Sequence, residues 1–217
     1  MNTNKEKRGR KQLLLSLFAV LKASFDTRFM FAAQFVVLPP ALYYNRCDKQ
    51  YEKENFMIRH AGKEDLPQIL EIYASARTFM KEHGNPTQWK DGYPGQELLL
   101  SDMEKEQLYV HETDTGIHGV FVFFVGEDPN YKIIEQGAWK STEAYGVIHR
   151  IASDGKERGI FHQSIEFAKK RCNHLRIDTH ADNTVMQKLI VSHGFEPCGI
   201  VYVQDHSPRL AFEYLNE

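Results

Sequence analysis

Residues 143–167, EAYGVIHRIASDGKERGIFHQSIEF, constrain the fold most, because two hydrophobic periodicities meet within them. In the first part, residues 145, 147, 149 and 151 fall on one face at the two-residue spacing of a strand. Gly155 and Gly159 interrupt this pattern, and apolar residues then return at helical spacing. The stretch is therefore predicted to be a strand, a turn and a helix. The turn is either an ordinary connection or a phosphate-binding loop, because N–H groups at a helix start are unpaired and carry positive potential.

The same two hydrophobic periodicities, those of strands and of helices, predict the elements in the rest of residues 57–217. The predicted elements are a strand at 57–61, helices at 65–80 and 96–106, strands at 107–113, 119–126 and 143–153, a helix at 157–171, a strand at 175–181, a helix at 183–193, and strands at 195–203 and 209–215. The residues Asp-Thr-Gly at 114–116 indicate a hairpin turn. Strands and helices in this order predict an α/β fold, a mixed sheet flanked by helices.

Charge is distributed unevenly along the 217 residues. Residues 1–56 carry a net charge of +5 and residues 57–217 a net charge of −7, which together make the −2 of the whole chain. The small total charge does not indicate a polyanionic partner, so we expect no nucleic-acid binding. The change of composition near residue 56 predicts an N-terminal extension followed by one domain at 57–217.

Residues 1–56 contain two apolar runs, at 13–21 and 29–44. The first follows a basic cluster, as in a signal peptide, but a lysine ends it and no clear cleavage site follows. The second is short for a bilayer span and contains two prolines. We therefore expect no membrane anchor, with an amphipathic surface helix as an alternative. Because the codons before Met57 can form a ribosome-binding sequence, we expect translation to begin there and the extension to be poorly ordered or outside the native domain.

The chain has three cysteines and ten histidines. They form no CxxC pair and no HExxH motif, so we expect no metal site. Such sparse use of cysteine is typical of a protein that remains reduced in the cytoplasm.

The order of elements, with a glycine loop between the long strand and its helix, resembles the GNAT superfamily of acetyl-coenzyme A-dependent N-acyltransferases. The resemblance covers about all of residues 57–217. The cofactor loop of that family usually reads Gln/Arg-x-x-Gly-x-Gly/Ala. Here residues 156–161 read KERGIF, with a basic first position and Gly159 in the fourth, whereas Phe161 departs from the pattern.

A second family feature is an asparagine that opens a helix ending in Gly-Phe. It corresponds here to NTVMQKLIVSHGF, from Asn183 to Phe195. Many members carry a tyrosine in this helix that protonates the leaving thiolate, but the matching position is Ile190. The resemblance therefore does not imply a tyrosine general acid. The stretches QWKDGYP, IHRIASDGK and LRIDTHADN also resemble a bacterial GNAT subgroup.

The resemblance implies an enzyme that transfers an acetyl or related acyl group from coenzyme A to a primary amine. The acceptor would be a small molecule or a protein, the attack would be direct, and acetyl-coenzyme A would be the co-substrate without a metal. The residues that it assigns to the cofactor are Ile151, Ala152, Ser153, Lys156, Glu157, Arg158, Gly159, Ile160, Phe161 and Asn183. Ordinary ladder pairing and a solvated helix start are the alternative explanations for these positions.

Two side chains of the strand at 143–153 are candidates for the general base. Tyr145 and His149 share one face of this strand, which turns both toward the expected acceptor cleft. An imidazole titrates near neutral pH and suits proton transfer. The alternative is a core histidine that hydrogen-bonds to the backbone.

Three further residues are candidates for substrate binding. Trp89 and Tyr93 lie in the predicted loop at 83–95, where large aromatic side chains serve as pocket walls or pin the loop to the domain. His180 ends the strand at 175–181 with Asp178 on the same face, as an oriented Asp–His pair or a structural polar cluster.

Two other functions remain open at this point. A non-catalytic acyl-coenzyme A-binding module would explain Phe161 and Ile190. A membrane-tethered interaction protein would explain residues 1–56 if they are natively translated. We expect a cytoplasmic enzyme, and we leave a homodimer open.

Overall fold

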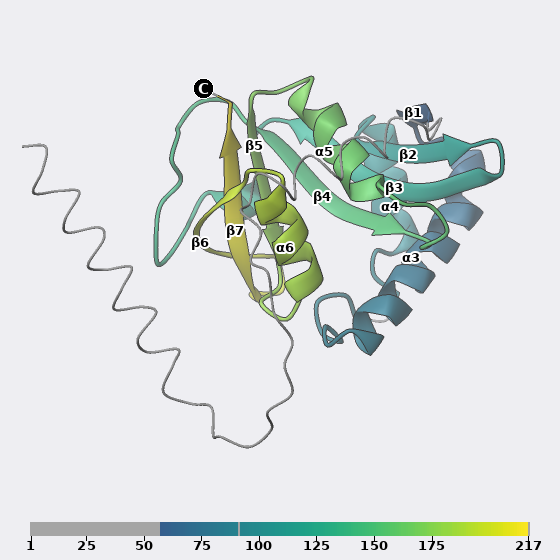
Figure 1. Ribbon diagram of the computed structural model, residues 1–217, viewed down its shortest axis with the longest axis horizontal. Coiled ribbons are helices and arrows are strands. Elements are labelled where there is room, and N and C mark those ends of the chain that lie inside the picture. The colour runs from purple at the N-terminus through teal and green to yellow at the C-terminus, as the bar shows by residue number, and fades with distance from the viewer. Residues whose placement is uncertain (1–56, 91, 217) are drawn as a thin grey trace, which may run out of the picture. The chain divides into compact units, whose positions relative to one another are not determined.

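The structure, a computed structural model, describes residues 57–90 and 92–216 (Figure 1). Its centre is a seven-stranded sheet in the order β1-β2-β3-β4-β5-β7-β6. The strands are β1 (Met57–His60), β2 (Leu108–Thr113), β3 (Gly116–Val125), β4 (Gly146–Ser153), β5 (His174–Thr179), β6 (Glu196–Tyr202) and β7 (Pro208–Leu215). β4 and β5 are parallel, and the other neighbouring pairs are antiparallel. The predicted mixed sheet is confirmed.

Helices cover both faces of this sheet (Figure 1). They are α3 (Leu66–Glu82), α4 (Gln96–Glu104), α5 (Ile160–Lys169) and α6 (Thr184–Ser192), with short 3-10 helices η1 (Lys63–Asp65) and η2 (Pro129–Tyr131). Residues of α5 and α6, among them Phe161 and Ile190, pack into one core cluster with β3, β4, β5 and β7. Residues of α3 and α4, among them Tyr73 and Leu99, form a second cluster with β2, β3 and β4. The sheet is therefore buried between two helical layers.

A glycine sets how closely α5 approaches the sheet. A Cβ atom at Gly119 of β3 would lie 2.5 Å from Cγ2 of Ile160, the first residue of α5. Only glycine leaves room for this contact. The start of α5 is therefore held directly against the sheet, next to the end of β4.

Several element boundaries differ from the predicted ones, and two of these differences and one unpredicted turn bear on the site. α5 begins at Ile160 rather than at residue 157, because Gly159 has φ of 80° and interrupts the helical backbone. β3 begins at Gly116, so the hairpin turn is shorter than predicted. The η2 turn follows Asp128, whose side chain accepts a hydrogen bond from the N–H of Asn130, and the hydrophobic pattern did not predict it. The expectations for residues 1–56 lie outside the described residues.

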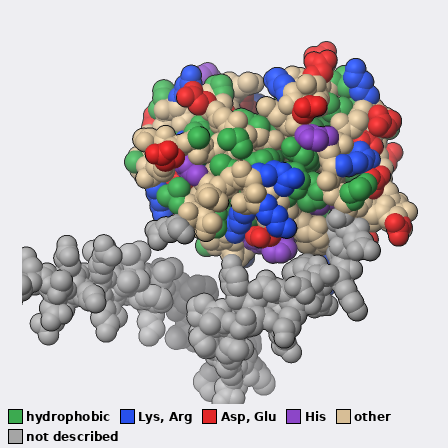
Figure 2. All heavy atoms as spheres, turned by 90° about the horizontal axis from the view of Figure 1, so that it is seen from above, with side chains coloured by type: hydrophobic (Ala, Val, Ile, Leu, Met, Phe, Trp, Pro, Cys, Tyr) green, Lys and Arg blue, Asp and Glu red, His purple; other side chains and the backbone are tan. Residues whose placement is uncertain are grey.

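Surface charge is mixed on the face seen in Figure 2. Acidic and basic side chains are interspersed there among apolar ones, and neither sign dominates.

Candidate active site

The parallel strands β4 and β5 part at the middle of the sheet. They pair only over residues 146–148 and 175–177. Beyond this point β4 continues beside β3 alone. A cavity of about 720 Å³ lies where they part. The second half of β4 and the end of β5 line it, together with parts of α3 and α6 and loop residues that include Trp89, Asp154 and Asp205. This volume is typical of a small-molecule site.

A bulge in β4 faces this cavity. Two residues of β4 stand opposite Phe121 of β3, and Arg150 has φ of 52°, which non-glycine residues seldom adopt. The hydroxyl of Tyr73 on α3 donates to the carbonyl oxygen of Arg150 at 2.9 Å. The guanidinium of Arg150 donates to Asp102 on α4 at 2.7 Å. Both helices therefore hold the bulge, at which the ladder between β3 and β4 is interrupted.

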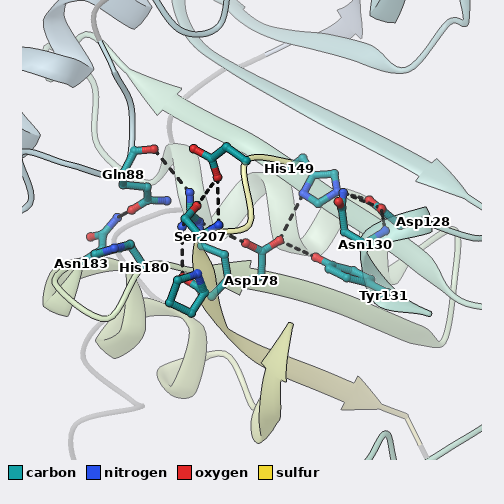
Figure 3. Close-up of polar contacts among 12 residues, drawn as sticks. Gln88, Asp128, Asn130, Tyr131, His149, Asp178, His180, Asn183 and Ser207 are labelled. Carbon is teal, nitrogen blue, oxygen red and sulfur yellow. Dashed lines mark hydrogen bonds and ion pairs between the residues drawn. The ribbon is translucent and has the colours of Figure 1, made fainter. Parts of the chain in front are cut away.

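His149, next to the bulge, lies between two carboxylates (Figure 3). Its Nε2 is 2.6 Å from Oδ2 of Asp128, and its Nδ1 is 3.6 Å from Oδ1 of Asp178. The hydroxyl of Tyr131 donates to the same oxygen of Asp178 at 2.7 Å. Both His149 and Asp178 line the cavity. The imidazole is thus fixed on one side and open to the cavity on the other.

The state of Asp128 determines which nitrogen of His149 carries the proton. Burial raises the pKa of Asp128, but hydrogen bonds from His149 and Asn130 lower it by more, so this pKa lies below its ordinary value. The ionised carboxylate accepts from Nε2–H of His149. Nδ1 is then the ring nitrogen that faces Asp178. A proton taken up at Nδ1 is stabilised by the nearby carboxylate of Asp178.

Tyr145 lies just before β4 and outside the residues that line the cavity. Its ring packs over the guanidinium of Arg176 at 3.9 Å, and its hydroxyl accepts from the N–H of Asp128 at 3.2 Å. The expectation that Tyr145 faces the cleft beside His149 is therefore not met. Tyr145 instead supports the backbone of the residue that orients His149.

The loop between β4 and α5 is anchored by a buried histidine. Nδ1 of His118 on β3 is 2.9 Å from Asp154, and its Nε2 is 2.7 Å from the hydroxyl of Thr115. Asp154 also accepts from the backbone N–H of Lys156 at 3.0 Å. Burial raises the pKa of Asp154, but His118 and Lys156 lower it by more, so the carboxylate stays ionised. This cluster fixes the loop that leads into the start of α5.

The residues that the resemblance assigned to the cofactor divide into two groups. Five line the cavity: Ile151, Ala152, Ser153, Phe161 and Asn183. The other five form the loop and the start of α5 outside that lining: Lys156, Glu157, Arg158, Gly159 and Ile160. The side chain of Phe161 is buried in the core with its ring against His193, and α5 begins before it.

The loop at 83–95 crosses to the other half of the sheet and carries two of the predicted substrate residues. Trp89 and Tyr93 line the cavity. The side-chain oxygen of Gln88 accepts from the amide of Asn183 at 3.0 Å, and Asn183 caps α6. The ring of Trp89 meets Tyr73 edge-on at 5.6 Å. The loop is thus attached to both helical layers.

His180 is not among the residues that line the cavity. Its Nδ1 accepts from the N–H of Asp182 at 3.2 Å, whereas Asp178 contacts Tyr131 and His149 (Figure 3). The predicted pairing of His180 with Asp178 is therefore wrong. The strand ends at Thr179, so His180 no longer shares a face with Asp178.

Solved structures with this fold are known. A GNAT-family acetyltransferase from Streptococcus agalactiae is 26% identical, with a TM-score of 0.68 over 75% of this chain and 96% of that one. A Staphylococcus aureus protein assigned as an acetyltransferase is 28% identical, with a TM-score of 0.55 over 73% and 98%. A GNAT-family acetyltransferase from Listeria monocytogenes, 22% identical with a TM-score of 0.55 over 73% and 93%, shares the fold. This chain carries a GNAT-superfamily segment. No protein-family model and no curated protein matches the sequence.

Within this GNAT segment, sequence reasoning missed the partners of the candidate base. Asp128 and Tyr131 belong to the η2 region, which has no clear periodicity, and the DPN turn was the one local signal. In residues 57–90 and 92–216, no cluster of three or more His, Cys, Asp or Glu side chains could hold a metal ion. No helix in those residues is long and apolar enough to span a bilayer.

Proposed function

We propose that this GNAT segment transfers an acetyl group from acetyl-coenzyme A to a primary amine, with His149 as general base. The observation that carries the proposal is the position of His149, between Asp128 and Asp178, at the cavity where β4 and β5 part. The GNAT acetyltransferase from Streptococcus agalactiae, at 26% identity, supports acetyl transfer.

Features of the cavity fit a coenzyme A thioester. The parting of β4 and β5 leaves a place in the cavity for the extended pantetheine arm. Residues 151–153 no longer pair with β5, which leaves backbone groups for the same arm. The start of α5 after Gly159 offers N–H groups and a positive dipole to phosphates.

Each group has a defined task in the proposed reaction. The amine nitrogen forms a bond to the thioester carbonyl carbon, the carbon–sulfur bond breaks, and the thiolate takes a proton from solvent. Nδ1 of His149 accepts the proton that the amine loses, and Asp178 stabilises the imidazolium. A backbone N–H at the bulge around Arg150 is suited to polarise the carbonyl oxygen. Ile190 is buried and carries no exchangeable proton, so it contributes none to the thiolate.

The proposal is tested by following thiol release from acetyl-coenzyme A with a panel of primary amines. For His149→Gln we expect kcat to fall by roughly 10²–10⁴-fold, because a positioned general base contributes that much. The control is His180→Gln, which alters a histidine that contacts Asp182 outside the cavity lining. Full activity of the His149 variant would refute its role, and thioester binding without transfer to any amine would favour a binding module.

A further inference from the structure

We infer that the acceptor is a small primary amine whose nitrogen is attached to an apolar, ring-bearing body. This inference rests on the proposed acetyl transfer and names its substrate class. Three features of the cavity support it. One wall is aromatic, and this wall contacts the bulge through Tyr73. The lysine and arginine side chains that line the cavity already have partners within the protein.

The wall consists of large apolar side chains that remain accessible. Phe79 is 47% exposed and Tyr93 37% exposed, although both line a concave site. Val185, also exposed, lines the cavity from α6. Accessible apolar side chains gathered in a cavity mark a surface that a ligand covers. Trp89 completes the wall, with its ring centre 6.1 Å from that of Tyr93.

The aromatic wall is joined to the reacting centre through one residue. Trp89 packs edge-on against Tyr73, and the hydroxyl of Tyr73 donates to the carbonyl oxygen of Arg150 in the bulge. His149 precedes Arg150 and lines the same cavity. An amine with its body against this wall therefore lies in the compartment that holds the base.

The lysine and arginine side chains that line the cavity already have partners within the protein. Lys90 pairs with Asp205 at 3.0 Å, and Arg150 donates to Asp102 at 2.7 Å. Arg209 donates to the hydroxyl of Ser207 at 2.8 Å and forms an ion pair with Asp178 at 3.9 Å. A carboxylate on the acceptor would have to displace one of these partners, at the cost of leaving a charge or a polar group unpaired. The aromatic wall needs no such displacement, which favours an uncharged body.

The experiment compares four acceptors with the full chain and acetyl-coenzyme A: 2-phenylethylamine, ethanolamine, putrescine and a short peptide with a free N-terminus. We expect kcat/KM for 2-phenylethylamine to exceed that for ethanolamine by roughly tenfold or more, the selectivity that apolar pocket contacts supply. Phe79→Ser should reduce this preference at least about threefold, whereas Phe79→Leu should largely retain it. Phe79 is exposed, so neither variant opens a hole in the core.

Val191→Ser is the matched control. Val191 is 54% exposed on α6 and is not among the residues that line the cavity, so its loss should leave the preference unchanged. Equal kcat/KM for 2-phenylethylamine and ethanolamine, or preferred transfer to putrescine or the peptide, would overturn the inference while acetyl transfer stands. Transfer to none of the four would overturn both.

Discussion

Asp128 is the side chain on which the orientation of His149 depends, through a hydrogen bond of 2.6 Å. We predict that Asp128→Asn lowers kcat by roughly 10–100-fold, because the amide no longer stabilises the imidazolium that forms in the reaction. KM for acetyl-coenzyme A should stay unchanged, because Asp128 is not among the residues that line the cavity. Steady-state kinetics with each substrate varied in turn would measure both constants.

The control for this variant is Asp182→Asn, which alters another aspartate beside a histidine. Asp182 contacts His180 away from the cavity, and both kinetic constants should keep their wild-type values. If Asp128→Asn raises KM for acetyl-coenzyme A and leaves kcat intact, Asp128 supports cofactor binding rather than the base. Because the pKa of Asp128 is already below its ordinary value, we expect no activity change from its protonation above about pH 5.

At the residue scale, the sequence supports the choice of His149 but not its environment. A histidine on the long strand is an identifiable candidate from its residue type and its strand face alone. Asp128 lies 21 residues away, and its approach depends on how η2 folds over the sheet. The position of Tyr145 could not be predicted either, because it depends on where β4 begins. β4 begins at Gly146, so Tyr145 lies outside the strand and contacts the η2 region instead of the cleft.

At the scale of elements, β2 and α5 are linked by a buried histidine whose titration should affect stability. Nε2 of His111 donates to the hydroxyl of Ser164, which donates in turn to the carbonyl of Ile160. Burial lowers the pKa of His111 from 6.5 to about 4. The unfolded chain therefore binds a proton that the folded protein does not, and stability falls as pH drops from 6.5 toward 4.

We predict that lowering the pH from 7.5 to 5.0 removes about 2 kcal/mol of unfolding free energy through His111 alone. In His111→Gln, which still offers an N–H to Ser164, this part of the loss should disappear. Urea unfolding of both proteins at the two pH values measures the difference, since the other titrating groups contribute equally. Identical losses in the wild type and the variant would show that His111 does not titrate as inferred.

The order of the elements could be predicted because each strand and helix has a clear period of its own. The positions where the backbone departs from that period could not be predicted. Gly159 delays α5 by adopting a left-handed backbone conformation, and the bulge at Arg150 breaks the alternation along β4. Two helices of one layer, α3 and α4, stabilise that bulge through Tyr73 and Asp102 only after the fold has formed. These departures occur at the cavity, where function tolerates local strain.

At the scale of the whole molecule, the two halves of the sheet meet through few backbone pairs. β4 and β5 share three residue pairs, and loop 83–95 adds contacts through Gln88 to Asn183 and through Lys90 to Asp205. A ligand held between β4 and β5 would contact both halves. Its binding should therefore stabilise the entire domain rather than one element.

We predict that acetyl-coenzyme A raises the melting temperature of the full chain. At 100 times its Kd, a ligand specific for the native state adds about 2.7 kcal/mol, which corresponds to roughly 5–10 °C for a domain of this size. Adenosine monophosphate, which lacks the pantetheine arm, should give a much smaller shift at the same concentration. Differential scanning fluorimetry over a concentration series measures both ligands. Equal shifts would mean that the parting of β4 and β5 does not hold the arm, and the proposed position of the thioester beside His149 would fail.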